Sequence, residues 1–333
     1  MYINDLKGII FNRHLSNGAD ELLIVTGYIS SIPFKELKDL PINCKVIYGM
    51  YGTERISEQL HAVLKDIQSS AENLELFYSK GDVHAKCYIW KKEGKVVDAI
   101  VGSANFSQKG LATNMREVVV TTDESDYEGL NDYFNDILNN SLSCDSDEVR
   151  IKTEQEEKFI AAEQLIKCNL SFLDRTLEVP KSSGLNWGAN STQVGGTAHT
   201  CIGDAEIRIR KPNAIDFPTL FPPKLGISRN RNQSGRLHRQ NDEVELIWDD
   251  GRTMKGSFEQ NMEIDGMLYP KAICSSDTKA ELGLYLRDRL KVTPTEIITK
   301  ETLEAYGRTD VTISLQGEGV YYMDFSVKKD ANE

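Results

Sequence analysis

The sequence predicts two domains, an α/β domain with a mixed sheet followed by a β-rich domain that closes into a small barrel. Three observations support this prediction. A chain of 333 residues is long enough to bury two cores. In the first half, short apolar runs alternate with segments of helical spacing, as in layered α/β domains. In the second half, strand-like runs follow one another across glycine turns.

The first half reads as an alternation of strands and helices. Helical spacing of apolar residues appears at 1–19 and 55–70, and Pro33 suits the first turn of a helix at 32–40. We expect strands at the apolar, β-branched runs of this half, and one further helix. The strands are 21–30, 44–52, 74–79 and 116–123, and the helix is 127–140.

The domain boundary is expected in a loop rich in Pro, Gly and Ser at 180–188. An acidic stretch at 145–163 precedes it, and we expect this stretch to continue as a helical connector to about Asp174. The predicted domains are therefore residues 1–178, with the connector, and residues 179–333.

The second half changes to β-rich patterning. Turn pairs such as Asp250-Gly251 and Asp265-Gly266 separate runs of alternating or apolar residues, and two segments keep helical spacing. The expected strands are 205–211, 243–250, 253–261, 269–275, 311–317 and 321–327, and the expected helices are 279–290 and 299–307.

Composition favours a cytoplasmic protein without a membrane segment. No apolar run approaches the roughly 20 residues of a membrane span, and the N-terminus lacks a signal-peptide pattern. Six cysteines without a CxxC pair favour a reducing compartment and argue against a zinc ribbon. The net charge of −12 argues against nucleic acid when taken alone. The charge is uneven, however, because 123–163 is acidic and 205–240 is basic, and local patches decide phosphate binding.

Two pairs of polar residues with equal spacing stand within 81–110. His84 and Lys86 are two apart on one expected strand, and Ser103 and Asn105 repeat this spacing on the next. Residues two apart on a strand share a face, so a hairpin would bring the four side chains together. Many donors without an acidic cluster suit an anionic substrate that is handled without a divalent metal ion.

A phosphodiester fits this set of groups. A site for it must offset charge on the non-bridging oxygens, supply a nucleophile and protonate the leaving oxygen. Lys86 and Asn105 suit the oxygens, Ser103 can donate a further hydrogen bond, and His84 can attack phosphorus. No other histidine stands in a matching context. A symmetric dimer with two copies of His84 would supply the missing acid.

The pattern resembles the signature of the phospholipase D superfamily, H-x-K followed by G-S-x-N. H-x-K alone is a common chance pair, and the G-S-x-N-F-S run at a suitable separation favours the catalytic interpretation. The matching positions are His84, Lys86, Gly102, Ser103 and Asn105. The resemblance implies a phospholipase D-like N-terminal domain and a phosphohistidine intermediate that needs no metal or other cofactor.

Two neighbouring positions bear on this resemblance. Glu117 stands near the place where nuclease members carry a carboxylate that orients the histidine, which implies that role here. The common pattern has Asp five residues after the lysine, whereas this chain has Lys91, and Asp98 is the nearest acid before the glycine. The single motif copy resembles nuclease members that dimerise, rather than lipid hydrolases with two motifs in one chain.

The second half offers candidate DNA contacts. Arginine suits phosphates and guanine edges, and Asn and Gln suit adenine or phosphate. A polar, glycine-rich loop at 186–200 is suited to a DNA groove. A run of arginines at 227–240 offers further contacts, and its alternative interpretation is a surface loop without DNA contact. The candidates are Trp187 and Gln193 in the loop, Arg208 and Arg210 in the run at 205–211, and Arg229, Arg231, Arg236 and Arg239 in the run at 227–240.

The whole chain is similar to restriction endonucleases of the NgoFVII/NgoAVII type. The segments SGLNWG, LGLYLRDRL, YGRTDV and YYMDFS suggest this similarity. It implies a C-terminal B3-like pseudobarrel that reads DNA with two arms. The first arm would be 186–200, and the second would run from Glu259 through Gln260 and Asn261 to Lys271. Related systems use a separate ATP-dependent helicase-like protein, and this chain has no P-loop.

The sequence therefore predicts a homodimeric, metal-independent endonuclease of a restriction system that acts on double-stranded DNA. Any ATP would be used by a helicase-like partner. Two alternatives stay open, a phospholipase D-type lipid phosphodiesterase and a DNA-binding protein with a degenerate nuclease site.

Overall fold

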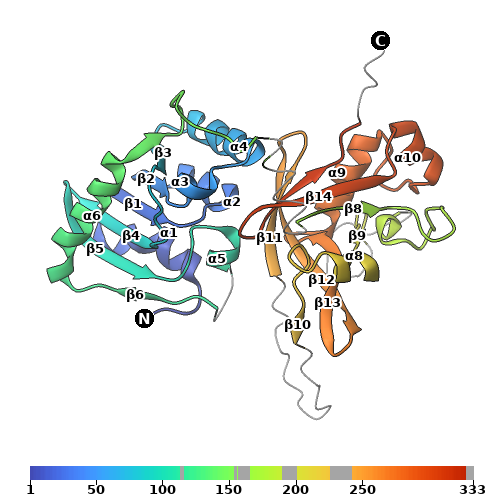
Figure 1. The fold of residues 1–333 in the computed structure, drawn as a ribbon, viewed down its shortest axis with the longest axis horizontal. Coiled ribbons are helices and arrows are strands. Elements are labelled where there is room, and N and C mark those ends of the chain that lie inside the picture. The colour runs from blue at the N-terminus through green and yellow to red at the C-terminus, as the bar shows by residue number, and fades with distance from the viewer. Residues whose placement is uncertain (113–115, 154–155, 157–165, 190–200, 226–241, 328–333) are drawn as a thin grey trace. The chain divides into compact units, whose positions relative to one another are not determined.

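The computed structural model describes residues 1–112, 116–153, 156, 166–189, 201–225 and 242–327. The chain forms two compact units (Figure 1). The first contains Met1–Glu156 together with Gln316–Val320, and the second contains Glu157–Leu315 together with Tyr321–Glu333.

A seven-stranded mixed sheet forms the centre of the first unit, with strand order β6-β5-β4-β1-β2-β3-β7. β1, β2 and β3 are parallel, and the remaining neighbours are antiparallel. The strands are β1 (Glu21–Thr26), β2 (Asn43–Tyr48), β3 (Leu74–Ser79), β4 (Cys87–Lys92), β5 (Lys95–Gly102), β6 (Val119–Thr121) and β7 (Ser141–Ser143).

Helices cover this sheet, and β1 is buried along nearly its whole length. Phe134 and Ile137 of α6 pack against Leu23 and Val25 of β1 and their neighbours. This burial explains why β1 reads as a continuous apolar run rather than an alternating one. The helices are α1 (Leu6–Asn17), α2 (Ser31–Glu36), α3 (Tyr51–Glu54), α4 (Glu58–Ser69), α5 (Gln108–Ala112) and α6 (Tyr127–Asn139).

An eight-stranded sheet forms the second unit, with the path β10-β13-β12-β11-β15-β14-β8 and β9 paired to β13. Its strands are β8 (Lys167–Ser171), β9 (Ile207–Arg208), β10 (Lys224–Leu225), β11 (Asp242–Trp248), β12 (Thr253–Ile264), β13 (Met267–Ser275), β14 (Asp310–Gly317) and β15 (Val320–Asp324). Its helices are α8 (Lys211–Asp216), α9 (Lys279–Leu290) and α10 (Lys300–Tyr306).

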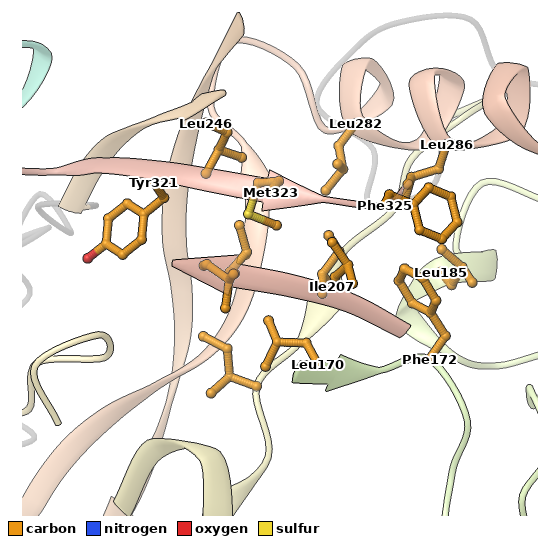
Figure 2. Packing of buried hydrophobic residues seen from close by; sticks show 14 of the residues in the cluster. Leu170, Phe172, Leu185, Ile207, Leu246, Leu282, Leu286, Tyr321, Met323 and Phe325 are labelled. Carbon is orange, nitrogen blue, oxygen red and sulfur yellow. The ribbon is translucent and has the colours of Figure 1, made fainter. Parts of the chain in front are cut away.

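The core of the second unit lies between α9 and the curved sheet (Figure 2). Leu282 and Leu286 of α9 are buried in one cluster with Leu246 of β11 and Met323 of β15. Thr278 caps the first turn of α9 by accepting a hydrogen bond from Glu281 N (3.3 Å). The strands and helices thus share one core, as the predicted small barrel requires.

The connector differs from its prediction. The expected helix to about Asp174 is wrong, because Lys167–Ser171 is the strand β8, paired antiparallel with β14. This pairing places β8 with the second unit, so the units divide at Glu156 rather than after residue 178. Cys168 and Leu170 of β8 are buried in the second core, and the residues between and beside them face the other side of the strand. This alternation of apolar and polar residues is typical of a strand with one buried face.

Among the helices that the structure describes, none has both the length and the apolar character needed to cross a bilayer.

Candidate active site

The predicted hairpin forms, and its open end collects the candidate catalytic residues. β4 and β5 pair antiparallel from Cys87 and Val101 onward, and the hydrogen bond from Gly102 N to Lys86 O (3.1 Å) continues the pairing by one step. The prediction that the two polar pairs lie on strands is wrong, because β4 begins at Cys87 and β5 ends at Gly102. His84 and Lys86 precede β4, and Ser103 and Asn105 follow β5. The predicted hairpin forms and brings His84, Lys86 and Asn105 together, whereas Ser103 is hydrogen-bonded to Glu117 at the same end.

Lys86 is the buried cation of the site. Its side chain is 6% exposed, whereas His84 is exposed. Lys86 Nζ lies 2.8 Å from His84 Nδ1 and donates to His84 O at 2.6 Å. Burial lowers the pKa of the Lys86 ammonium, and the carboxylates of Glu318 and Glu117 oppose this shift. The site therefore contains a desolvated positive charge directly beside an accessible imidazole.

Asn105 is held by the end of β1. Its Oδ1 accepts a hydrogen bond from Tyr28 N (3.1 Å), and its side chain is buried. The next residue, Phe106, is fully buried and donates its N–H to Thr26 Oγ1 (2.8 Å). Ser30 N in turn donates to Phe106 O (3.2 Å). These contacts fix the loop after β5, so the Asn105 amide is preorganised at the hairpin's open end.

Gly27 lies at the centre of the site, and the sequence interpretation missed it. It follows β1, whose last paired residue with β4 is Val25. A Cβ atom at Gly27 would be 3.2 Å from Lys86 Nζ, 3.2 Å from Asn105 Oδ1 and 3.4 Å from His84 Cδ2. The missing side chain therefore leaves the space around which these three residues converge. A glycine directly after a buried strand was the signal that could have found it.

Ser103 and Glu117 form a separate pair at the same end of the hairpin. Ser103 Oγ donates to Glu117 Oε2 (2.5 Å) and accepts from Val118 N (3.0 Å). The expected direct contact between Glu117 and His84 is not made in this structure, where the ring nitrogens of His84 face Lys86. Glu117 still lies near enough to Lys86 to influence its pKa.

Tyr28 and Glu318 are further members of the site. The Tyr28 ring lies edge-on to the His84 ring, with centroids 6.0 Å apart, and its hydroxyl donates to Glu54 Oε1 (2.6 Å). Glu318 belongs to the same compact unit and accepts a hydrogen bond from Asn105 Nδ2 (2.5 Å). The sequence interpretation expected Glu117 near the site but missed the Glu318 carboxylate, because Glu318 is far from the motif in the sequence.

Asp98 is used outside the site. Arg13 binds it with two hydrogen bonds, from Nε to Oδ2 (2.6 Å) and from Nη2 to Oδ1 (3.2 Å). Lys91, which stands where the common pattern has Asp, lies within β4 and pairs with Glu21 of β1 in the sheet register.

In the second unit, several predicted DNA contacts gather around one buried carboxylate, Glu206. Gln260 Nε2 donates to Glu206 Oε2 (2.6 Å), and Arg208 and Lys271 lie near enough to influence the Glu206 pKa. Trp187 joins this group through Lys279, whose Nζ lies 5.6 Å from the centroid of its ring. We call Trp187, Arg208, Gln260 and Lys271 the arm surface.

Other predicted contacts lie beside the arm surface or outside the described residues. Asn261 is exposed next to Gln260, and Arg210 follows Arg208 with buried Ile209 between them. The remaining predicted residues lie outside the part of the chain that the structure describes. They are Gln193, Arg229, Arg231, Arg236 and Arg239.

Two family models match the chain, one for each unit. Residues 4–151 match the NgoFVII restriction endonuclease N-terminal PLD domain, and residues 160–316 match the NgoFVII C-terminal B3-like DNA-binding domain. The chain belongs to the NgoFVII restriction endonuclease family. As a member of this family it is a DNA phosphodiesterase, with a phospholipase D-like nuclease domain followed by a B3-like DNA-binding domain. Both predicted fold classes are thereby confirmed.

Two solved structures have partial likeness to this NgoFVII family member. NucT from Helicobacter pylori is 17% identical, with a TM-score of 0.30, and the match covers 40% of this chain and 89% of that chain. Polyphosphate kinase from Porphyromonas gingivalis is 10% identical, with a TM-score of 0.30, and the match covers 47% of this chain and 26% of that chain. No curated protein matches the chain.

Proposed function

We propose that this protein hydrolyses DNA phosphodiesters through a covalent phosphohistidine on His84, without a metal ion, at the interface of a homodimer. The observation that supports this most is the convergence of His84, Lys86 and Asn105 around Gly27, where a Cβ would be within 3.4 Å of all three. An imidazole, a buried ammonium and a fixed amide supply a nucleophile and two donors for phosphate oxygens.

The hydrogen bonds of His84 determine which nitrogen can attack. With Lys86 Nζ donating to Nδ1, the neutral ring carries its proton on Nε2 and has no free electron pair there. Attack by Nε2 requires the other tautomer. We therefore expect Lys86 to turn toward a phosphate oxygen when substrate arrives. Glu117, held by Ser103, would then accept a hydrogen bond from Nδ1–H and orient the ring.

The reaction balances in two displacements. In the first, Nε2 of His84 forms a bond to phosphorus while the bond from phosphorus to one deoxyribose oxygen breaks. His84 of the second protomer, protonated, gives its proton to that leaving oxygen. In the second, water attacks phosphorus, the N–P bond breaks, and the now neutral second histidine takes the proton from water. One histidine cannot be nucleophile and acid in the same step, which is why two chains are needed.

We propose that the B3-like domain selects the phosphate by binding double-stranded DNA through the arm surface. Trp187 supplies an aromatic face, Arg208 and Lys271 supply positive charge, and Gln260 supplies a base-reading amide. Asn261, Arg210, Gln193 and the four arginines at 227–240 extend this proposed contact set. The resemblance to related systems favours a separate ATP-dependent helicase-like partner.

The decisive experiment compares plasmid cleavage by the wild type and His84→Ala, in EDTA, with and without ATP and the neighbouring gene products. We expect His84→Ala to lose at least about 10³-fold in cleavage rate and to keep specific DNA binding. His61→Gln is the matched control, because His61 lies on α4 and hydrogen-bonds Tyr78 instead of the site. Full cleavage by His84→Ala would disprove the nucleophile assignment, and loss of wild-type activity in EDTA without ATP would disprove metal independence.

A degenerate nuclease site is the second candidate, supported by Lys91 at the usual Asp position and by the Glu318 carboxylate on Asn105. Specific DNA binding by the wild type without any cleavage, with every partner supplied, would establish it. Release of headgroups from phospholipid vesicles without DNA cleavage would establish a lipid phosphodiesterase instead.

A further inference from the structure

The hairpin of β12 and β13 contains one backbone irregularity, at Gln260. The two strands keep one register throughout, with Glu259 opposite Ala272 and Asn261 opposite Pro270. The pair that a regular ladder would place between them, Gln260 opposite Lys271, is missing. Gln260 has φ 55°, in the left-handed region that disfavours residues with a Cβ atom. Such strain persists only where surrounding contacts maintain it.

The irregularity is coupled to a side-chain contact. In a regular strand, the Gln260 side chain would leave the sheet on the face opposite Glu259. Ala272 is the register partner of both Glu259 and Arg208, so Glu206, two residues before Arg208, belongs to the Glu259 face. The hydrogen bond from Gln260 Nε2 to Glu206 Oε2 (2.6 Å) therefore places the Gln260 side chain on the Glu259 face, opposite to the face that regular strand alternation would give it.

The segment around Gly184, which precedes the first predicted arm at 186–200, packs against Glu206. Glu206 is 4% exposed, and its N–H donates to Gly184 O (3.0 Å). A Cβ at Gly184 would be closer to Glu206 Cγ than real atoms come, so the backbone of that segment packs directly on the carboxylate side chain. Trp187 follows three residues later. Glu206 thus lies beneath both parts of the arm surface.

The geometry of the hydrogen bond fixes which end of the Gln260 amide faces Glu206. Burial, together with the charge of Glu259, raises the pKa of the Glu206 carboxyl, while Arg208, Lys279 and Lys271 oppose this shift. The contact joins Gln260 Nε2 to Glu206 Oε2, so the amide of Gln260 presents its NH₂ to an acceptor oxygen of Glu206. The carbonyl oxygen Oε1 and the second N–H of Gln260 are then oriented away from Glu206.

We propose that Glu206 is a positioning residue that fixes the amide polarity of Gln260, so that Gln260 recognises adenine in the DNA major groove. Oε1 would accept from adenine N6, and the second N–H of Nε2 would donate to N7. Guanine offers acceptors at both positions and would leave Oε1 without a donor. This inference rests on the proposed DNA-binding role of the arm surface.

The test uses the full chain and a pool of DNA duplexes with randomised sequence, from which bound duplexes are selected and sequenced. We expect the wild type to select a site that contains an adenine-specific position. In Glu206→Gln, the neutral amide can face Gln260 in either orientation, so the adenine preference at that single position should fall about tenfold or more. Preferences at the other positions, the salt dependence and the melting temperature should stay within error.

Asp277→Asn is the matched control, because it removes one negative charge from an exposed residue whose ion-pair partner is Lys255. We expect it to keep the adenine preference. Glu206→Asp retains the charge but withdraws the carboxylate by one methylene, and it should lose the preference as Glu206→Gln does. It therefore replaces Glu206→Gln if that variant does not fold.

The outcomes separate this inference from the proposal on which it rests. If the wild type selects no sequence, the DNA-reading role of the arm surface fails. If the wild type selects a site and both Glu206 variants select it with an unchanged adenine preference, the positioning role of Glu206 is overturned. Loss of stability with unchanged base preference would give Glu206 a structural role only and would also overturn it.

Discussion

At the scale of single residues, the site depends on a few side chains that are buried against their chemical preference. Lys86 is desolvated and lies beside His84, and Asn105 is buried with both ends of its amide bonded. Tyr28 N fixes the Asn105 carbonyl oxygen. The Lys86 ammonium and Asn105 Nδ2 must exchange their present acceptors, His84 and Glu318, for phosphate oxygens when an anion binds.

Gly27→Ala tests how tightly the site converges. The added Cβ would be 3.2 Å from Lys86 Nζ and Asn105 Oδ1, so both groups must move by a few tenths of an ångström. We expect cleavage to fall by about tenfold or more, because small displacements of reacting groups are costly, while folding is retained. Single-turnover cleavage and thermal unfolding measure the two effects.

Gly129→Ala is the control for this substitution, since a Cβ at Gly129 of α6 meets open space. It should leave cleavage unchanged. A wild-type cleavage rate in Gly27→Ala would show that phosphate does not bind in this space.

Glu318→Gln tests the competition for Asn105. Asn105 Nδ2 donates to the Glu318 carboxylate, which occupies a donor that the mechanism assigns to a phosphate oxygen. A neutral amide is a weaker competitor than a carboxylate, so we expect cleavage to rise by at least about threefold at limiting DNA. Glu304→Gln, an exposed residue on α10, should have no such effect. Slower cleavage by Glu318→Gln would give Glu318 a supporting role instead.

At the scale of elements, the position of the site follows from strand ends. β1 and β4 are antiparallel neighbours, so the C-terminal end of β1 meets the start of β4. The start of β4 also meets the end of β5 at the open end of their hairpin. Gly27, His84 and Asn105 come from these three strand ends, and their proximity is a consequence of sheet topology.

α4 supplies a pH-dependent contribution to the stability of the first unit. Burial, followed by the charge of Lys65, lowers the pKa of His61, whose Nδ1 lies 2.9 Å from the Tyr78 hydroxyl. Between this lowered pKa and the ordinary value near 6.5, the unfolded chain binds a proton that the folded chain does not. The free energy of unfolding should therefore decrease as pH falls below about 6.5.

His61→Gln removes this titration. We expect the drop in melting temperature between pH 7.5 and pH 5.5 to be smaller in the variant by roughly 1–3 °C, measured by calorimetry on the full chain. Equal drops in the two proteins would contradict a lowered pKa for His61.

At the scale of the whole molecule, the negative net charge does not predict how the protein interacts with DNA, because the charge is unevenly distributed. The chain carries −12 overall, yet Lys86 and the basic residues of the arm surface present positive charge locally. The proposed DNA contacts are electrostatic, so we expect DNA binding to weaken steeply as salt increases.

Mixing experiments test whether catalysis needs two chains. If each active site uses two copies of His84, a dimer with one His84→Ala protomer is inactive. After subunit exchange, an equal mixture of wild type and His84→Ala should keep about one quarter of the cleavage rate, because only wild-type pairs are active. A value of about one half, at equal total protein, would indicate that each protomer cleaves alone.

The two fold classes, the hairpin and the motif can be predicted from the amino-acid sequence, because alternating apolar patterns and a rare local motif are encoded by neighbouring residues. The sequence interpretation named Trp187, Arg208, Gln260 and Lys271 as candidate DNA contacts, and the structure brings these four residues near Glu206. It failed at Lys167–Ser171, where a short buried strand inside a polar stretch forms only because β14 provides its partner.

The hydrogen-bond partners of the motif residues depend on tertiary contacts that the sequence pattern does not show. Gly27 and Tyr28 reach His84 because β1 and β4 are sheet neighbours, and Glu318 reaches Asn105 from 213 residues away. The partners of Glu117 and Glu206 likewise depend on which backbones pack together. Spacing along the chain identifies which groups can perform chemistry. Their hydrogen-bond partners and solvation are set by contacts between segments that are distant in sequence.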